Sequence, residues 1–245
     1  MIKLEHTEVI GWEAAVRGMR NPLNSWDKSD SLFIRCDFCD EMDDLRLAMM
    51  CGGKAPIILD NDLDLMTRLR NAGTDHRKFM RMLTVYVDIT APLYWWKEFD
   101  TYKVGTVANS CSTMHKIHAK EFTLDDFSCE HLFNSDKEQI VEEDWVDISE
   151  EGVDGEQWDS IEFVKMIVRA LNVYRERYLA TKDKKYWWQM IQLLPTSYNQ
   201  KRTVMLNYEV LANMYKSRKD HKLDEWHELC HWIEALPYSQ LITGN

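Results

Sequence analysis

The stretch Arg81-Met82-Leu83-Thr84-Val85-Tyr86-Val87-Asp88-Ile89-Thr90 carries the clearest local signal in the chain. Apolar residues recur there at every second position, which places Leu83, Val85, Val87 and Ile89 on one face. Such alternation predicts a strand with one buried face.

Helix signals flank the strand on both sides. Pro92 is well placed to open a helix, because the first helical residue needs no partner for its N–H. That helix would bury Leu93, Trp96 and Phe99. Before the strand, residues 62–71 combine helical spacing with an acidic first turn and Gly73 just past the end.

The remaining segments predict an α/β (α+β) chain with a helical C-terminal half. Residues 2–10 alternate as a first strand, 13–19 form a short helix, and 24–53 are mostly loop with an apolar stretch at Leu45 to Met50. A long helix is expected to start with Ser160 as its cap and to bury a stripe of residues. That stripe is Ile161, Val164, Val168, Leu171 and Tyr178. Three further helices are expected at 184–193, 203–219 and 223–235.

Composition limits the classes of protein. With 245 residues, 45% of them hydrophobic, the chain can bury a core as one domain over residues 1–245. A net charge of −11 argues against non-specific binding to nucleic acid or to an anionic membrane. There is no apolar run of membrane-spanning length and no signal peptide. Six irregularly spaced cysteines favour reduced thiols and a cytoplasmic location.

Residues 142–159 are strongly acidic and lack hydrophobic periodicity. This composition is typical of a solvated insertion, lid or linker. We expect an acidic insertion near residues 135–159.

Two short motifs suggest metal chemistry. His227-Glu228-Leu229-Cys230-His231 matches the H-E-x-x-H pattern, in which two His one helical turn apart bind zinc and the Glu acts as general base. Little chain follows to supply a third ligand, and Leu223, Trp226, Cys230 and Ile233 read as an ordinary core face. Cys36 and Cys39 form a lone C-x-x-C, with Cys51, His115 and His118 as distant candidates. We expect no metal site.

No glycine-rich phosphate loop is present, so a bound nucleotide would need side chains and helix N-termini. The predicted 203–219 helix is more informative. Asn207 and Arg218 are eleven residues apart, about three turns, so they would share one face with Leu211 and Met214 between them. An amide can donate to and accept from a flat heterocycle, and a guanidinium offers a planar fork. The alternative is a structural amide and a surface ion pair.

The C-terminal region resembles the flavin-dependent thymidylate synthases. The residues that carry the resemblance are Leu194-Pro195, Asn207, Leu211, Asn213 and Arg218, followed by the helix with Trp226. In that family the first Asn contacts the flavin and the Arg binds the substrate pyrimidine. The spacing from Pro195 to Arg218 needs no gap.

A second block, from Ala91-Pro92 to Thr101-Tyr102-Lys103, resembles the family stretch that ends in Arg-His-Arg. Asn109 and Ser112 fall near the Asn and Ser of the motif's tail. Residues 15–20 and 73–81 match more loosely, and His76 corresponds to a family His directed toward the flavin. The resemblance spans most of the chain and implies a single domain with a central antiparallel-type sheet.

The chain departs from the family where cations are expected. Thr101-Tyr102-Lys103 replaces Arg-His-Arg, Ser110 replaces a Glu, and Ile191 replaces an Arg. Each lost charge-assisted bond costs about 1.5–3 kcal/mol of ligand binding unless another cation compensates. Lys97, Arg77 and Lys78 are the candidates for that compensation.

The resemblance implies FAD as cofactor, with NADPH and methylenetetrahydrofolate as co-substrates. It also implies a homotetramer with sites between subunits. Arg218 would stabilise negative charge on the pyrimidine. The cofactor-binding residues would be Asn207, Asn213, His76, Lys103 and Tyr102. The substrate-binding residues would be Glu98, Thr101, Ser112, Asn109 and Arg218.

Three hypotheses follow. The first is an FAD-dependent one-carbon transfer to a pyrimidine deoxynucleotide, most simply the reductive methylation of dUMP to dTMP. The second keeps the fold but changes the pyrimidine or lacks turnover, because the Arg-His-Arg motif is absent. The third is a zinc hydrolase built on the H-E-x-x-H motif.

Overall fold

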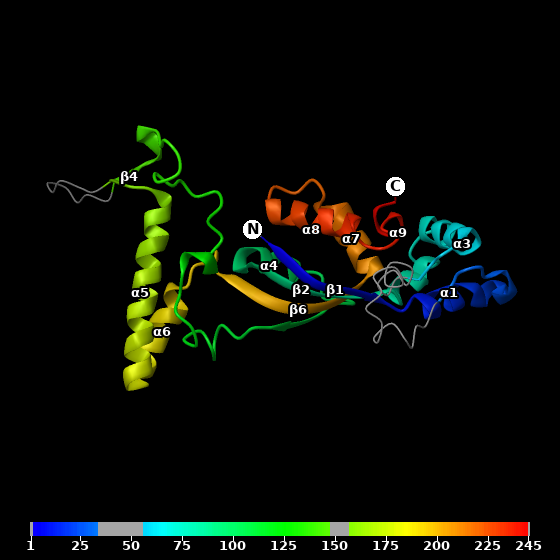
Figure 1. Cartoon of the computed structure of the whole chain (residues 1–245), viewed down its shortest axis with the longest axis horizontal. Helices are drawn as coiled ribbons and strands as arrows, with labels where there is room; N and C mark the ends of the chain where they lie inside the picture. Colours follow the sequence, from blue (N-terminus) through cyan, green and yellow to red (C-terminus); the bar gives the residue numbers. More distant parts are fainter. Residues whose placement is uncertain (1, 34–55, 148–156, 245) are drawn as a thin grey trace, which may run out of the picture. The chain divides into compact units, whose positions relative to one another are not determined.

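The structure is a computed structural model that describes residues 2–33, 56–147 and 157–244 (Figure 1). It divides into two compact units. Unit 1 contains Thr90–Phe99 and Ser110–Lys201, and unit 2 contains Ile2–Ile89, Asp100–Asn109 and Arg202–Asn245. The motif pair Cys36 and Cys39, together with Cys51 and the apolar stretch from Leu45 to Met50, lies outside the described residues.

Four strands form the main antiparallel sheet, in the order β1-β2-β6-β3. Their bounds are Lys3–Ile10 for β1, Thr84–Pro92 for β2, Asn199–Asn207 for β6 and Val107–Ser110 for β3. The two strands expected from alternation, at 2–10 and 81–90, are confirmed as β1 and β2. In β2, Val85, Val87 and Ile89 are buried, as the alternation requires.

Unit 2 contains most of the helices. They are α1 (Trp12–Arg20), the 3-10 turns η1 (Asn21–Leu23), η2 (Trp26–Lys28) and η4 (Arg77–Arg81), and the helices α3 (Asp60–Asn71), α7 (Tyr208–Arg218), α8 (Asp224–Glu234) and α9 (Gln240–Thr243). Helices α7, α8 and α9 pack on one another. The expected helices at 13–19, 62–71 and 223–235 are confirmed within two residues.

The expected helix over 203–219 is wrong in its first half. Strand β6 continues to Asn207, and α7 begins only at Tyr208. The segment is extended because burial alternates along it: Val204 and Leu206 are buried while Thr203 is exposed. The β-branched residues Thr203 and Val204 also favour extended backbone.

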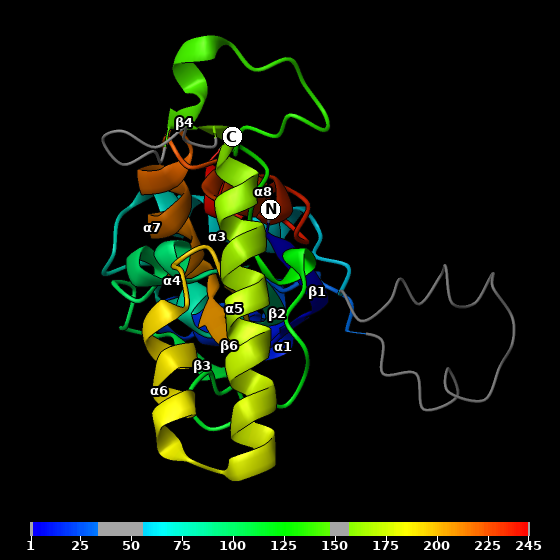
Figure 2. The same ribbon diagram turned by 90° about the vertical axis from the view of Figure 1, so that its left-hand side faces the viewer.

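Unit 1 is built on an antiparallel helical pair, α5 (Ser160–Thr181) and α6 (Lys184–Leu193), which lie side by side (Figure 2). Its core consists of Ile117, Phe122, Phe127, Ile161, Val164, Leu171 and Met190. The unit also contains α4 (Leu93–Phe99), the 3-10 turns η5 (Leu124–Asp126) and η6 (Glu142–Asp144), and the two-stranded sheet of β4 (Val146–Asp147) and β5 (Gln157–Trp158).

The cap of α5 differs from the expected one. Asp159, not Ser160, is the N-cap, and its carboxylate accepts from the backbone N–H of Glu162 at 3.0 Å. The Asp159 carboxylate also accepts from the N–H and hydroxyl of Ser135. A carboxylate binds several N–H donors of a helix N-terminus better than a hydroxyl does, because it carries full negative charge. These bonds outweigh burial and lower the pKa of Asp159.

A buried ion pair fastens the N-terminal part of unit 2. Arg20, at the end of α1, donates from Nε to the Asp62 carboxylate on α3 at 2.6 Å. The other carboxylate oxygen accepts from the hydroxyls of Ser29 and Ser31. Burial by itself would raise the pKa of Asp62, but the bonds from Ser31, Ser29 and Arg20 lower it overall.

A backbone bridge and a side-chain contact hold the residues that flank positions 34–55. Leu32 and Ile57 pair as an isolated antiparallel bridge, with N–H to O distances of 2.8 and 3.1 Å. The hydroxyl of Tyr238 accepts from the N–H of Ile58 at 2.7 Å and lies 3.0 Å from the carbonyl of Pro56. The C-terminal part of unit 2 therefore holds the segment that leads into α3.

Across the described residues, every helix is too short or too polar to cross a membrane.

We expect Asp62→Asn to lower the free energy of unfolding by about 3 kcal/mol, because it leaves the Arg20 guanidinium buried without a counter-charge. Since the folded-state pKa of Asp62 is lowered, its stabilisation is present above the unfolded pKa of about 4 and disappears as the pH falls through the folded value. Urea unfolding at pH 7 and pH 3 measures both effects.

The matched control is Asp64→Asn, which removes the partner of Arg68 in an exposed i,i+4 pair on the same helix. That change should stay within about 0.5 kcal/mol. Equal effects of the two substitutions would contradict the role assigned to Asp62.

Candidate functional site

Arg218, at the end of α7, is held from two directions. Its guanidinium carbon lies 4.5 Å from the ring centroid of the buried Trp226 on α8. Its Nε donates to the hydroxyl of Tyr102 at 3.0 Å. A cation over an indole ring is stabilised by the negative face of the ring. These two contacts fix the plane of the guanidinium and the direction of its Nε–H.

The support extends beneath Trp226. The rings of Tyr102 and His221 both contact the indole edge-on, at centroid distances of 6.1 and 6.2 Å. His221 is itself fixed, since its Nδ1 accepts from the backbone N–H of Leu223 at 3.1 Å. Tyr102 and Arg218, predicted for different roles, are thus brought together by the structure.

Asn207 lies at the junction of β6 and α7. It is the N-cap of α7, and its Oδ1 accepts from the N–H of Val210 at 3.0 Å. The prediction that Asn207 belongs to the helix is wrong, because its backbone is extended (φ −138°, ψ 168°). Asn207 stands just before the first residue of α7 and Arg218 is the last residue, so the length of the helix lies between them.

Gly105 lies against the Asn207 amide. The backbone of Gly105 has φ +79°, and a Cβ at this position would be 2.9 Å from Asn207 Nδ2. Both the left-handed backbone and the close approach favour glycine. The loop that carries Tyr102 therefore follows the amide edge of Asn207.

The first turn of α7 carries a buried carboxylate with two cationic partners. Glu209 accepts from the Nε of Arg77 at 3.2 Å, and it forms a second ion pair with Arg81. Burial by itself would raise the pKa of Glu209, but its bonds to Arg81 and Arg77 lower it overall. The cluster therefore carries one more positive than negative charge.

Arg77 also connects this cluster to a predicted residue. Its Nη2 lies 3.4 Å from Oδ1 of Asn213, on the next turn of α7. His76, the expected flavin-facing residue, is the N-cap of η4 beside Arg77, and its side chain is exposed. The structure therefore brings the segment of His76 to the helix of Asn213.

The remaining predicted residues divide between the units. Thr101, Lys103 and Asn109 belong to unit 2, and all three are exposed. Glu98 and Ser112 belong to unit 1. Glu98 is half-buried at the end of α4.

Ser112 lines a cavity of about 250 Å³ in unit 1. The lining residues are Thr90, Cys111, Ser112, Thr113, Lys120, Asp125, Asp126, Tyr198, Asn199, Gln200 and Lys201. Lys120 forms an ion pair with Asp126, and burial raises the pKa of Tyr198. The cavity offers hydroxyls, amides and equal numbers of ammonium and carboxylate groups, which suit a polar ligand that both donates and accepts.

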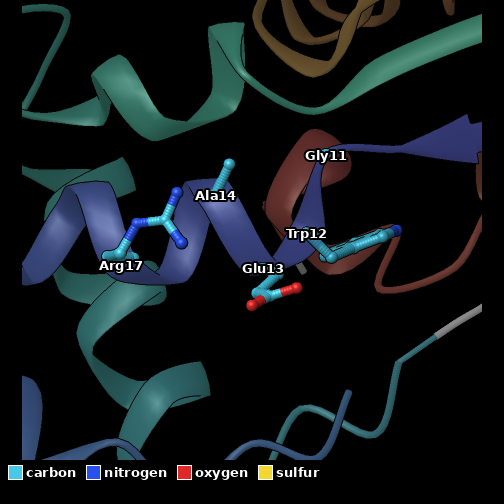
Figure 3. Close-up of a pocket in the computed structure, with 5 residues that line it drawn as sticks. All are labelled: Gly11, Trp12, Glu13, Ala14 and Arg17. Carbon is cyan, nitrogen blue, oxygen red and sulfur yellow. The ribbon is translucent and has the colours of Figure 1, made fainter. Parts of the chain in front are cut away.

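A second cavity, of about 330 Å³, opens at the start of α1 and is lined by Gly11, Trp12, Glu13, Ala14 and Arg17 (Figure 3). Glu13 and Arg17 point from successive turns of the same helix (Figure 3). Gly11 is required at the helix start, since its φ is +96° and a Cβ there would be 2.1 Å from the carbonyl oxygen of Met82. Arg17 belongs to the loosely matching block 15–20, and none of the predicted site residues lines this cavity.

The H-E-x-x-H motif lies on α8. His227 is half-buried, and Glu228 and His231 are exposed, while Trp226, Cys230 and Ile233 are buried as expected for a core face. Within the described part of the chain, no three His, Cys, Asp or Glu residues are placed to hold a metal ion. His227 instead lies 3.7 Å from the Asp224 carboxylate.

Sequence reasoning missed the Glu209 cluster and the platform that Trp226 forms under Arg218. Arg77 and Glu209 are 132 positions apart, so spacing offers no signal for their pairing. One indication of the Glu209 cluster is present in the sequence: Arg77 is among the cations that can compensate for the missing Arg-His-Arg.

Comparison with known proteins gives the fold. No protein-family model matches the sequence, and no curated protein matches it. Thymidylate Synthase X (ThyX) from Helicobacter pylori, crystallised with FAD and dUMP, matches with a TM-score of 0.60 and 17% identity over 100% of this chain and 98% of that chain. A second crystal structure of the Helicobacter pylori enzyme with FAD and dUMP gives a TM-score of 0.59 at 17% identity, over 99% of this chain and 98% of that one.

A third solved structure differs in its activity. The UMP/dUMP methylase PolB from Streptomyces cacaoi, bound with 5-Br dUMP, matches with a TM-score of 0.54 and 15% identity over 100% of this chain and 95% of that chain. The chain therefore has the mixed α/β fold of flavin-dependent thymidylate synthases over its whole length. The matched structures reported above are a thymidylate synthase and a UMP/dUMP methylase.

We expect Asn207→Ala to lower the free energy of unfolding by about 1 kcal/mol, because it removes the N-cap of α7. Asn207→Asp should stay within a few tenths of a kcal/mol, because a carboxylate caps equally well. Thermal unfolding by circular dichroism measures both. No loss of stability in the Ala variant would show that the cap does not hold α7.

Proposed function

We propose that the protein is a flavin-dependent enzyme that transfers a one-carbon unit to a pyrimidine deoxynucleotide, most simply by reductive methylation of dUMP to dTMP. The observation that carries the proposal is the fixed guanidinium of Arg218 in a chain whose fold matches FAD- and dUMP-bound ThyX along its length. The second candidate substrate class, UMP or another pyrimidine nucleotide, is favoured by the likeness to PolB.

The chemistry at Arg218 follows from its geometry. Trp226 occupies one face of the guanidinium and Tyr102 occupies its Nε. A planar fork in a fixed orientation recognises a planar acceptor such as a pyrimidine carbonyl with its adjacent ring nitrogen. A pre-placed cation at this position stabilises negative charge on the ring, which makes C5 more nucleophilic.

The residues of unit 2 fit a flavin. The backbone of Gly105 lies against the Nδ2 edge of Asn207, and the side-chain amide of Asn207 can donate to and accept from a heterocycle. Arg77, Lys78 and Arg81 on η4 supply cations suited to the FAD phosphates. When bound, FAD supplies the redox chemistry, and the protein supplies orientation and charge. We assign Asn213, His76 and Lys103 to the same cofactor.

We assign Ser112, which lines the cavity of unit 1, to the substrate. Glu98, Thr101 and Asn109 complete the proposed substrate-binding set. NADPH and methylenetetrahydrofolate as co-substrates, a homotetramer with sites between subunits, and a cytoplasmic location belong to the same proposal.

The proposal predicts a yellow protein that binds FAD and releases tritium from C5-labelled dUMP in the presence of NADPH and methylenetetrahydrofolate. Arg218→Ala should lower that release at least about 100-fold, since it removes charge stabilisation of roughly 3 kcal/mol. Lys216→Ala is the control, because Lys216 is an exposed cation on the same helix. Circular dichroism verifies that both variants fold.

The alternatives give different results in the same experiment. Release from labelled dCMP or UMP but not from dUMP would replace the substrate. Flavin binding without release from any pyrimidine would indicate a binding protein without turnover. Stoichiometric zinc without flavin would refute the proposal in favour of a hydrolase.

Tyr102→Phe tests whether the hydroxyl orients Arg218. The substitution keeps the ring and removes one hydrogen bond to a charged group, so kcat should fall about 10- to 100-fold. Because Tyr102 acts through Arg218, the variant combined with Arg218→Ala should be no slower than Arg218→Ala alone. Additive losses would show that Tyr102 acts separately from Arg218.

A further inference from the structure

The first turn of α7 and the 3-10 turn η4 meet at the carboxylate of Glu209. Its Oε1 accepts from Nε of Arg77 at 3.2 Å and from Nη2 of Arg81 at 3.3 Å, and its Oε2 accepts from Nε of Arg81. The side chain of Glu209 is 9% exposed, whereas that of Arg81 is 54% exposed. Arg81 thus binds the carboxylate with both N–H groups of one guanidinium edge, and Arg77 binds it with a single N–H.

Arg77 places the neighbouring N–H of its own edge on a different acceptor. Its Nη2 donates to Oδ1 of Asn213 at 3.4 Å. Glu209 and Asn213 are four residues apart on α7, so they are neighbours on one face of the helix. The N–H groups along one guanidinium edge are parallel, which lets a single arginine bridge two adjacent acceptors. Arg77 is therefore shared between a carboxylate and an amide.

The bond from Arg77 determines which atom of the Asn213 amide faces a ligand. A side-chain amide has an oxygen that accepts and a nitrogen that donates. A guanidinium has donors only and stays protonated, so it excludes the orientation in which Nδ2 of Asn213 would face it. The side chain of Asn213 is exposed, and its Nδ2 is turned away from Arg77. Asn213 therefore presents a hydrogen-bond donor.

Packing already fastens η4 to the rest of unit 2. Phe79 and Met80 are 2% and 0% exposed, and η4 contacts α1, α3 and α7. The backbone N–H of Tyr208 donates to the carbonyl of Leu83 at 3.1 Å, which ties the start of α7 to the residues that follow η4. Attachment of η4 therefore gives no reason for Arg77 to bind an exposed amide.

We propose that Glu209 is a positioning residue for the flavin: it holds Arg77 against Oδ1 of Asn213, so that Nδ2 of Asn213 donates to an oxygen of the isoalloxazine ring. The inference rests on the proposed flavin-dependent function and assigns a task to a carboxylate that has none there. Glu209 acts through Arg77 and Asn213 rather than by contact with the flavin.

A ring oxygen is the acceptor that fits this donor. An amide N–H is neutral and suits the neutral carbonyl oxygens of an isoalloxazine ring. The phosphates of FAD are matched by cations instead, and η4 supplies Lys78 and Arg81 for that purpose. Because Arg77 uses Nε and Nη2 on α7 itself, its effect on the ring is indirect.

Two substitutions of nearly unchanged shape test this link by equilibrium dialysis of the whole chain against FAD. Glu209→Gln removes the charge that holds Arg77, and Asn213→Asp replaces the donor with an acceptor that still pairs with Arg77. Each should raise the Kd for FAD at least about 10-fold, because a ring oxygen loses its donor. The double variant should bind FAD no more weakly than Asn213→Asp alone, since Glu209 acts through the amide that is already lost.

The visible absorption bands of FAD, recorded at saturation, separate a contact with the ring from a contact with the phosphates. Hydrogen bonds to the ring tune the electronics of a flavin, so both single variants should shift these bands in the same direction. Glu234→Gln is the control, because it removes the same charge from a carboxylate that accepts from Tyr215 on α7 at 2.7 Å. It should leave the Kd and the bands unchanged. Circular dichroism verifies that every variant folds.

Arg77→Lys breaks the same link without touching the buried carboxylate. It keeps the cation but lacks the planar edge that bridges two acceptors, so it should give the loss and the band shift of Glu209→Gln.

Three results would overturn the inference while the proposed function stands: an unchanged Kd in the Glu209→Gln and Arg77→Lys variants, unshifted bands, or additive losses in the double variant. An original chain that binds no FAD would refute the proposed function, and the role of Glu209 would fall with it. The two failures are therefore distinguished by the original chain alone.

Discussion

The start of α7 at Asn207 is the constraint on which the candidate site depends. One side chain ends strand β6 and caps the helix, through the bond from the Val210 N–H to its Oδ1. That junction fixes which α7 residues face inward, and so where Glu209, Asn213 and Arg218 lie along the helix. A shift of one residue would rotate all three by about 100° and would separate Arg218 from Trp226. The precision of the site therefore depends on one site residue, Asn207, whose side chain accepts from the backbone of α7.

Charge is arranged differently at the two ends of α7. At the first turn, Glu209 is buried and its charge is matched by Arg77 and Arg81. At the last turn, Arg218 is supported by a ring and a hydroxyl, which fix the orientation of its guanidinium. The first arrangement holds η4 against the helix. The second orients a single cation, which is why we place the chemistry there.

Local patterns predicted much of the fold. Strand β2 and helix α5 each bury one face, and the apolar residues of such a face recur at a regular spacing that can be read from a single sequence. The boundary at Asn207 was missed because Thr203 to Asn207 is too short to distinguish a strand from the first turn of a helix. Ser160 is a good cap by residue type, and the bonds from Ser135 and Glu162 that make Asp159 the cap are visible only in the folded chain. Arg218 and Tyr102 were identified by resemblance, whereas their contact with each other depends on chain folding that no spacing encodes.

The bridge between Leu32 and Ile57 bears on how the number of residues between them can vary in evolution. It closes the intervening segment at its base, and Tyr238 fixes the strand-like residues next to it. The fold on either side therefore depends little on how many residues the segment contains, since doubling the length of a closed loop costs only about 0.6 kcal/mol. This is a position where length variation among related chains, or insertion of a reporter domain, is compatible with an unchanged scaffold.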